Sequence, residues 1–148
     1  MTTRPAAVVL LGLALAGCGS SSPANTHRYT LRVVPANRAV LRHHLPFFVS
    51  PTRLAIETFG SSSCPWVPTK LTVIGPHLIR LDLRAGSREP GGALVPRPPA
   101  SGVCTTDFGP TPMVVSLPSR VDAHHRLTIR LYYGGHNPRP TIVTAPAM

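Results

Sequence analysis

Short runs in which apolar and polar residues alternate recur along the chain from about His27 and predict β-strands. The clearest run lies at residues 127–133, where Leu127, Ile129 and Leu131 alternate with more polar residues. Because successive side chains of a strand point to opposite faces, one face of this segment is expected to be buried and the other solvated. Similar runs lie at residues 29–33, 46–50, 53–58, 70–74, 78–83 and 113–117.

Turns rich in Gly and Pro separate these runs, and no segment shows a sustained helical period. The turn signals are Gly75-Pro76, Pro90-Gly91-Gly92, Gly109-Pro110 and Gly134-Gly135. Strands of this length and spacing predict an all-β fold, a small antiparallel β-sandwich that is immunoglobulin-like at most in architecture. A partly open β-barrel is the alternative.

Two segments depart from this pattern. Residues 37–44 are compatible with one or two helical turns, for which Asn37 would provide the N-cap. Residues 85–102 are too long and too rich in Gly and Pro for a tight hairpin. We expect them to be either disordered or draped over the surface as a loop.

A further apolar run follows Arg4 near the N-terminus, at residues 6–16. A transmembrane helix needs about 20 apolar residues, so this shorter run is typical of a signal peptide. The residues that end it, Leu15-Ala16-Gly17-Cys18, resemble the lipobox of bacterial lipoproteins. That resemblance implies attachment of a diacylglyceryl group to the thiol of Cys18 and cleavage before this residue. Two acyl chains anchor a protein stably to a membrane.

These features predict the organisation of the whole chain. We expect a signal peptide at residues 1–17, a flexible tether at residues 18–26 and a single β domain at residues 27–148, held on the extracytoplasmic side of the cell membrane. Once Cys18 carries lipid, Cys64 and Cys104 remain as a pair in an oxidising compartment, and we expect a disulfide between them. Two free thiols with a metal or redox role are the alternative, although the chain has no Cys-x-x-Cys spacing.

The segments around these two cysteines resemble an uncharacterised extracellular domain of high-G+C Gram-positive bacteria. The resemblance covers residues 49–133. The residues that carry it are Gly60-Ser61-Ser62-Ser63-Cys64-Pro65, Val67-Pro68-Thr69, Cys104-Thr105-Thr106-Asp107, Val115-Ser116-Leu117-Pro118 and Val121-Asp122. It implies that the two cysteines are paired within a small β fold, and it implies no activity.

The chain is strongly basic, with 15 Lys and Arg against 5 Asp and Glu and a net charge of +10. The predominance of Arg and Pro is typical of G+C-rich codon usage, which weakens charge alone as evidence for a partner. Six arginines nevertheless fall on the outward phase of predicted strands: Arg28, Arg32, Arg80, Arg84, Arg126 and Arg130.

If the strands at residues 78–83 and 127–133 are neighbours, Arg80, Arg84, Arg126 and Arg130 form a basic sheet face. Such a face would attract an anionic envelope polymer, lipid headgroups or a protein partner. An ordinary solvated face covered by arginine stems is the alternative. Nucleic acid is not an expected partner outside the cell, and the chain lacks the interleaved aromatic residues that stack on bases.

Histidine is the other candidate for chemistry, with 7 residues in the chain. They are the doublets His43-His44 and His124-His125, with His27, His77 and His136 elsewhere. Imidazole binds Zn and Cu, and a copper protein could add Met113. Adjacent strand residues point to opposite faces, so a doublet seldom provides two ligands to one ion. We therefore predict no metal site or cofactor, and a His-based Cu or Zn lipoprotein is the alternative function.

Catalytic machinery is not evident in the sequence. Ser61, Ser62 and Ser63 lack the Gly-x-Ser-x-Gly setting of a hydrolase nucleophile. Asp107, close to Cys104, is expected to accept hydrogen bonds from backbone amides in a turn. The expected function is thus a non-catalytic binding or structural module of the cell envelope.

Overall fold

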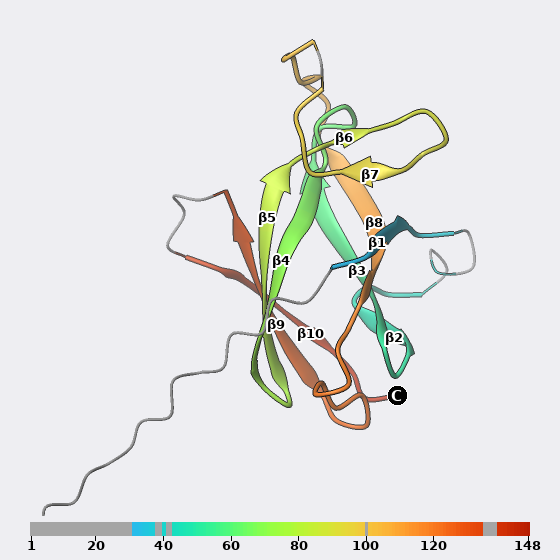
Figure 1. Cartoon of the computed structure of the whole chain (residues 1–148), viewed down its shortest axis with the longest axis vertical. Helices are drawn as coiled ribbons and strands as arrows, with labels where there is room; N and C mark the ends of the chain where they lie inside the picture. Colours follow the sequence, from blue (N-terminus) through green and yellow to red (C-terminus); the bar gives the residue numbers. More distant parts are fainter. Residues whose placement is uncertain (1–30, 38–39, 41–42, 100, 135–138) are drawn as a thin grey trace, which may run out of the picture.

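The computed structural model describes residues 31–37, 40, 43–99, 101–134 and 139–148. The predicted signal peptide, lipobox and tether lie outside these residues, as do His27, Arg28 and His136. The described chain forms two four-stranded sheets and a two-stranded hairpin (Figure 1). No helix among the described residues has the length and apolar character needed to cross a bilayer.

Sheet A is antiparallel throughout and matches the predicted strands with small shifts at their ends. In spatial order it contains β1 (Val33–Pro35), β8 (Gly109–Ser116), β3 (Arg53–Gly60) and β2 (Phe47–Ser50). Strand β1 begins later than the predicted run at residues 29–33. The first two residues of that predicted run, 29 and 30, lie outside the described chain.

Sheet B differs from the expected antiparallel arrangement at one pair of strands. In spatial order it contains β10 (Thr141–Ala145), β9 (Leu127–Tyr133), β5 (Leu78–Ala85) and β4 (Trp66–Gly75). Strands β5 and β9 run parallel, with Leu78 opposite Thr128 and Leu83 opposite Tyr133, whereas the other pairs are antiparallel. The sheet is therefore mixed.

The core lies between the two sheets and confirms the all-β class. Leu54 and Met113 of sheet A belong to the same buried cluster as Leu81, Ile129 and Leu131 of sheet B. These side chains are at most 1% exposed. The alternation of buried and exposed residues in β9 follows the sequence pattern, because the burial of one face fixes the register of a strand.

A second, smaller apolar cluster covers part of the outer face of sheet A. It joins Val40 to Ala55 on β3 and Val114 on β8. The backbone amide of Val40 donates a hydrogen bond of 3.1 Å to Oδ1 of Asn37, which is the contact expected of a cap, although no α-helix is present among the described residues. The remainder of the helical turn expected at residues 37–44 falls partly on residues 38–39 and 41–42, outside the described chain.

The segment at residues 85–102 packs against the domain rather than leaving it. It contains the hairpin of β6 (Ser87–Arg88) and β7 (Leu94–Val95), and Leu94 is buried. The amide of Gly86 donates a hydrogen bond of 2.8 Å to the carbonyl of Pro65. Of the two expectations for this segment, the draped loop is thus the one observed, with a short hairpin inside it.

The predicted disulfide between Cys64 and Cys104 is present, with 5.4 Å between the Cα atoms. Polar contacts around it join the same two segments. The Thr105 amide donates to Oγ of Ser63 at 2.8 Å, and the Ser62 amide donates to Oδ2 of Asp107 at 3.3 Å. Asp107 therefore accepts a backbone amide as expected, although the donor belongs to a loop distant in sequence rather than to its own turn.

Candidate functional site

The outward face of sheet B carries three of the four arginines of the predicted basic face. Because β5 and β9 are neighbours, Arg80 and Arg130 lie at paired positions, and the residues that follow them, Leu81 and Leu131, point into the core. Arg84 shares this outward phase on β5 and is exposed. Lys70 of β4 lies opposite Asp82 in the strand register and adds a fourth cation to the same face. We call Lys70, Arg80, Arg84 and Arg130 the basic face.

Arg126 lies at one end of the basic face, just before strand β9, whereas Arg32 lies beside the other sheet. Arg126 precedes β9 and is near the start of β5, whereas Arg84 is near the end of β5. At about 3.3 Å per residue, these two arginines are separated by roughly 25 Å along the strand direction, and each lies roughly 13 Å from the pair formed by Arg80 and Arg130. Arg32 lies beside β1 in sheet A, where its carbonyl accepts a hydrogen bond from the amide of Ser116.

One carboxylate partly neutralises the basic face. Nε and Nη2 of Arg80 donate to Oδ1 of Asp82 at 2.8 and 2.6 Å, and the Arg80 guanidinium carbon lies 3.9 Å from the ring centroid of Tyr132. Arg84 and Arg130 form no ion pair with a described residue. The net charge of the face is therefore carried mainly by Lys70, Arg84 and Arg130, an effect that the strand pattern alone does not reveal.

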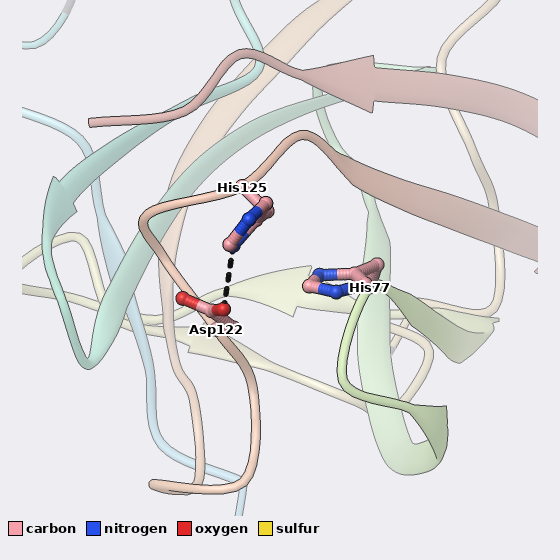
Figure 2. Close-up of side chains that lie close together, drawn as sticks. All are labelled: His77, Asp122 and His125. Atoms are coloured by element: carbon pink, nitrogen blue, oxygen red, sulfur yellow. Dashed lines mark hydrogen bonds and ion pairs between the residues drawn. The ribbon is translucent and has the colours of Figure 1, made fainter.

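A second group of polar side chains converges at the end of sheet B where β5 and β9 begin. Figure 2 shows His77 from the turn before β5 facing Asp122 and His125 from the loop before β9. One ligand atom from each of the three residues lies within 4.8 Å of the others. Nδ1 of His125 is 2.7 Å from Oδ2 of Asp122, and the two imidazole centroids are 4.8 Å apart.

Backbone hydrogen bonds hold the two turns of this group side by side. The Asp122 amide donates to the carbonyl of Pro76 at 3.0 Å, and the Thr128 amide donates to the carbonyl of His77 at 2.9 Å. Oδ1 of Asp122 accepts the amide of His124 at 2.9 Å. This hydrogen bond, followed by the one to His125, lowers the pKa of Asp122 below its usual value of 3.8.

Two imidazoles and one carboxylate are ligands that Zn²⁺ and Cu²⁺ accept. In the tetrahedral geometry typical of zinc, ligand atoms at about 2.0–2.2 Å from the ion lie about 3.3–3.6 Å apart, somewhat closer than the ligand atoms of this group. Small rotations of the exposed side chains of His77 and His125 would therefore bring this group within coordinating distance. Only one histidine of the 124–125 doublet belongs to the group, and because both lie in the loop before β9, the argument from strand geometry does not apply to them. Met113 is fully buried in the core and cannot contribute.

The sequence does not predict this group, because the parallel pairing of β5 with β9 brings His77 to the local pair of Asp122 and His125. The cysteine-containing segments, in contrast, lie together around the disulfide as the resemblance implies, but their assignment to an extracellular domain of high-G+C Gram-positive bacteria stays a prediction. Neither a protein-family model, nor a curated protein, nor a solved structure matches the chain.

Proposed function

We propose that the protein is a bacterial lipoprotein anchored through Cys18 on the extracytoplasmic side of the membrane, and that its β domain is a non-catalytic binding module. The resemblance of Leu15-Ala16-Gly17-Cys18 to a lipobox supports the anchor. The disulfide supports it as well, because it uses Cys64 and Cys104 and leaves Cys18 as the one other cysteine in the sequence. A structural disulfide is typical of exported proteins.

The observation that carries the binding function is the alignment of cations on one face of sheet B. Arg84 and Arg130 lie on adjacent strands, and Asp82 offsets the charge of Arg80 only. Cations gathered on one surface raise the local concentration of anionic partners. An anionic envelope polymer, a lipid headgroup region or an acidic protein surface therefore suits this face, and the binding would weaken as salt screens exposed charges over about 8 Å.

The anchor is tested by replacing the acylated residue. We expect Cys18→Ser to abolish both acylation and cleavage. An inhibitor of the lipoprotein signal peptidase is expected to leave an acylated but uncleaved precursor in cells that produce the unchanged protein. Metabolic labelling with a radioactive fatty acid, followed by fractionation, measures both. Release of soluble, processed protein from Cys18→Ser cells would refute the anchor.

Binding of a transition metal is the second candidate function, favoured by the convergence of His77, Asp122 and His125. We expect Zn²⁺ or Cu²⁺ to broaden or shift the imidazole NMR signals of His77 and His125 together. Replacement of either histidine by Ala should remove the tight phase of a calorimetric titration. His124→Ala is the matched control, because His124 is adjacent in sequence and contributes only its backbone amide. Equal loss in the control would exclude this site.

A further inference from the structure

A second cationic feature lies on the opposite sheet and is independent of the basic face. The outer surface of sheet A contains a hollow of about 310 Å³, lined by Arg32, Val34, Arg53, Val114 and Ser116. Of the five described residues that line it, two are arginines and none is acidic. We call this hollow the arginine pocket.

Strand register places the polar residues of the arginine pocket in one row. Ser116 on β8 lies opposite Arg53 on β3. On its other side, the Ser116 amide donates a hydrogen bond of 3.0 Å to the carbonyl of Arg32, next to the paired residues Val33 and Val115. Directly opposed residues in antiparallel strands are about 5 Å apart. The two arginine Cα atoms are therefore roughly 10 Å apart, with the hydroxyl of Ser116 between them.

All three side chains of this row project away from the core. Val115 and Leu54, their sequence neighbours, are fully buried between the sheets, and successive strand residues point to opposite faces. The next row on the outer face contains Val34 and Val114, which give the pocket an apolar side. The row thus presents two guanidinium groups and a hydroxyl beside an apolar surface.

The charges of the arginine pocket are not neutralised within the described chain. Neither Arg32 nor Arg53 forms an ion pair or a side-chain hydrogen bond with a described residue. The acidic residue that β3 presents on this face is Glu57, four positions from Arg53 and so about 13 Å away along the strand. Arg80, whose guanidinium is bound by Asp82, shows the contrasting arrangement on sheet B.

We propose that the arginine pocket binds a phosphate group. The guanidinium group presents paired N–H donors that match two oxygens of a phosphate, and two such groups supply the charge that a phosphate requires. The hydroxyl of Ser116 adds a donor between them. Apolar contacts with Val34 and Val114 suit the carbon atoms of a phosphate ester.

The position of the arginine pocket favours a lipid headgroup as the source of this phosphate, a step that rests on the proposed lipid anchor. Arg32 is separated from Cys18 by a stretch of chain that spans no more than about 50 Å when fully extended. A pocket so close to the anchor would remain within reach of the headgroups of the same membrane. Its occupation would hold the domain in one orientation against the bilayer.

NMR titration of the full chain in non-ionic detergent tests the proposal. Inorganic phosphate and dihexanoylphosphatidylglycerol serve as probes at constant ionic strength, and the Nε–Hε signals of Arg32 and Arg53 report binding. We expect saturable shifts of both signals. Arg32→Gln or Arg53→Gln should weaken binding at least about tenfold, because each removes charge-assisted hydrogen bonds. Ser116→Ala should weaken it by less.

Arg88→Gln and Arg97→Gln in the hairpin region, outside both the arginine pocket and the basic face, are the matched controls and should bind both probes as the unchanged protein does. Saturable binding of either probe supports the phosphate pocket. Binding of the lipid supports a lipid headgroup as the source of the bound phosphate. Binding of inorganic phosphate alone would exclude that source. Absence of saturable shifts with both probes, or an equal loss in the control variants, would overturn the proposal. Unchanged methyl signals of the core verify that each variant is folded. Because detergent replaces the membrane, the result does not depend on acylation of Cys18.

Discussion

Arg80 and Arg130 lie directly opposite each other on the parallel strands β5 and β9, and the carboxylate of Asp82 is bound to Arg80. Like charges at paired positions of a sheet destabilise it, and Asp82 relieves this repulsion on one side. The affinity of the face for anions therefore depends on a single negative charge among its cations.

Removal of that charge should strengthen binding. In a soluble chain beginning at residue 19, we expect Asp82→Asn to increase association with phosphatidylglycerol vesicles about fivefold and Arg130→Glu to reduce it by more, since each cation near an anionic surface contributes about 1 kcal/mol. Sedimentation of vesicles measures both. Arg97→Gln, in the hairpin region, is the control. Equal binding by Asp82→Asn, Arg130→Glu and the unchanged chain would exclude the basic face.

The disulfide is expected to contribute substantially to stability. It closes a loop with a sequence separation of 40 residues, for which the loss of chain entropy in the unfolded state corresponds to about 4 kcal/mol. The double variant Cys64→Ser with Cys104→Ser should therefore unfold at a much lower urea concentration. Cys18→Ser is the control and should leave the midpoint unchanged. A similar midpoint for all three chains would contradict the prediction.

Gly86 should tolerate no side chain. A Cβ atom at this position would lie 2.3 Å from the carbonyl oxygen of Val95 and 2.6 Å from Cγ2 of Val67, both closer than contact distance. We expect Gly86→Ala to lower the free energy of unfolding by about 1–3 kcal/mol, as overpacking does. Gly109→Ala, where an added Cβ meets nothing within 4 Å, should have a small effect. Thermal denaturation followed by circular dichroism measures the difference.

The hydrogen bonds of Asp107 predict a dependence of stability on pH. The hydroxyl of Thr105 and then that of Ser62 lower the pKa of Asp107 below its usual value of 3.8. A lowered pKa in the folded state contributes stability above pH 3.8, and this contribution is lost as pH falls through the folded-state pKa. The native chain should therefore melt at a higher temperature than Asp107→Asn at pH 7. The difference should disappear towards pH 2, and a difference that persists there would contradict this explanation.

The alternation of apolar and polar residues predicted most of the strands, but it did not predict which strands are neighbours in a sheet. Strand β9 begins and ends where its alternation does, because Leu127, Ile129 and Leu131 must share the buried face. Strand β10 was not predicted, since Pro140 and Pro146 flank a short segment whose Ile142 is exposed. The pairing of Cys64 with Cys104 was predicted because the assignment of Cys18 to lipid leaves these two cysteines, and the disulfide confirms the pairing.

The arrangement of the candidate sites depended on information that the pattern lacks. The sequence gives the outward phase of Arg80 and Arg130, but not that their strands are neighbours. Parallel pairing of β5 and β9 decides this, and it also brings His77 beside His125. The pairing of Arg53 with Ser116 likewise joins residues far apart in the chain, so the arginine pocket has no sequence signature.

The two cysteines of the disulfide differ in solvent exposure, and this difference determines which sulfur an incoming thiolate would attack. Cys64 is buried, with 5% of its surface exposed, whereas Cys104 lies in an exposed segment. Exchange begins with attack of a thiolate on an accessible sulfur. An incoming thiolate would therefore form its mixed disulfide with Cys104 and release the thiolate of Cys64 inside the protein. There that thiolate is held beside the new bond, placed to attack it and restore the original bridge.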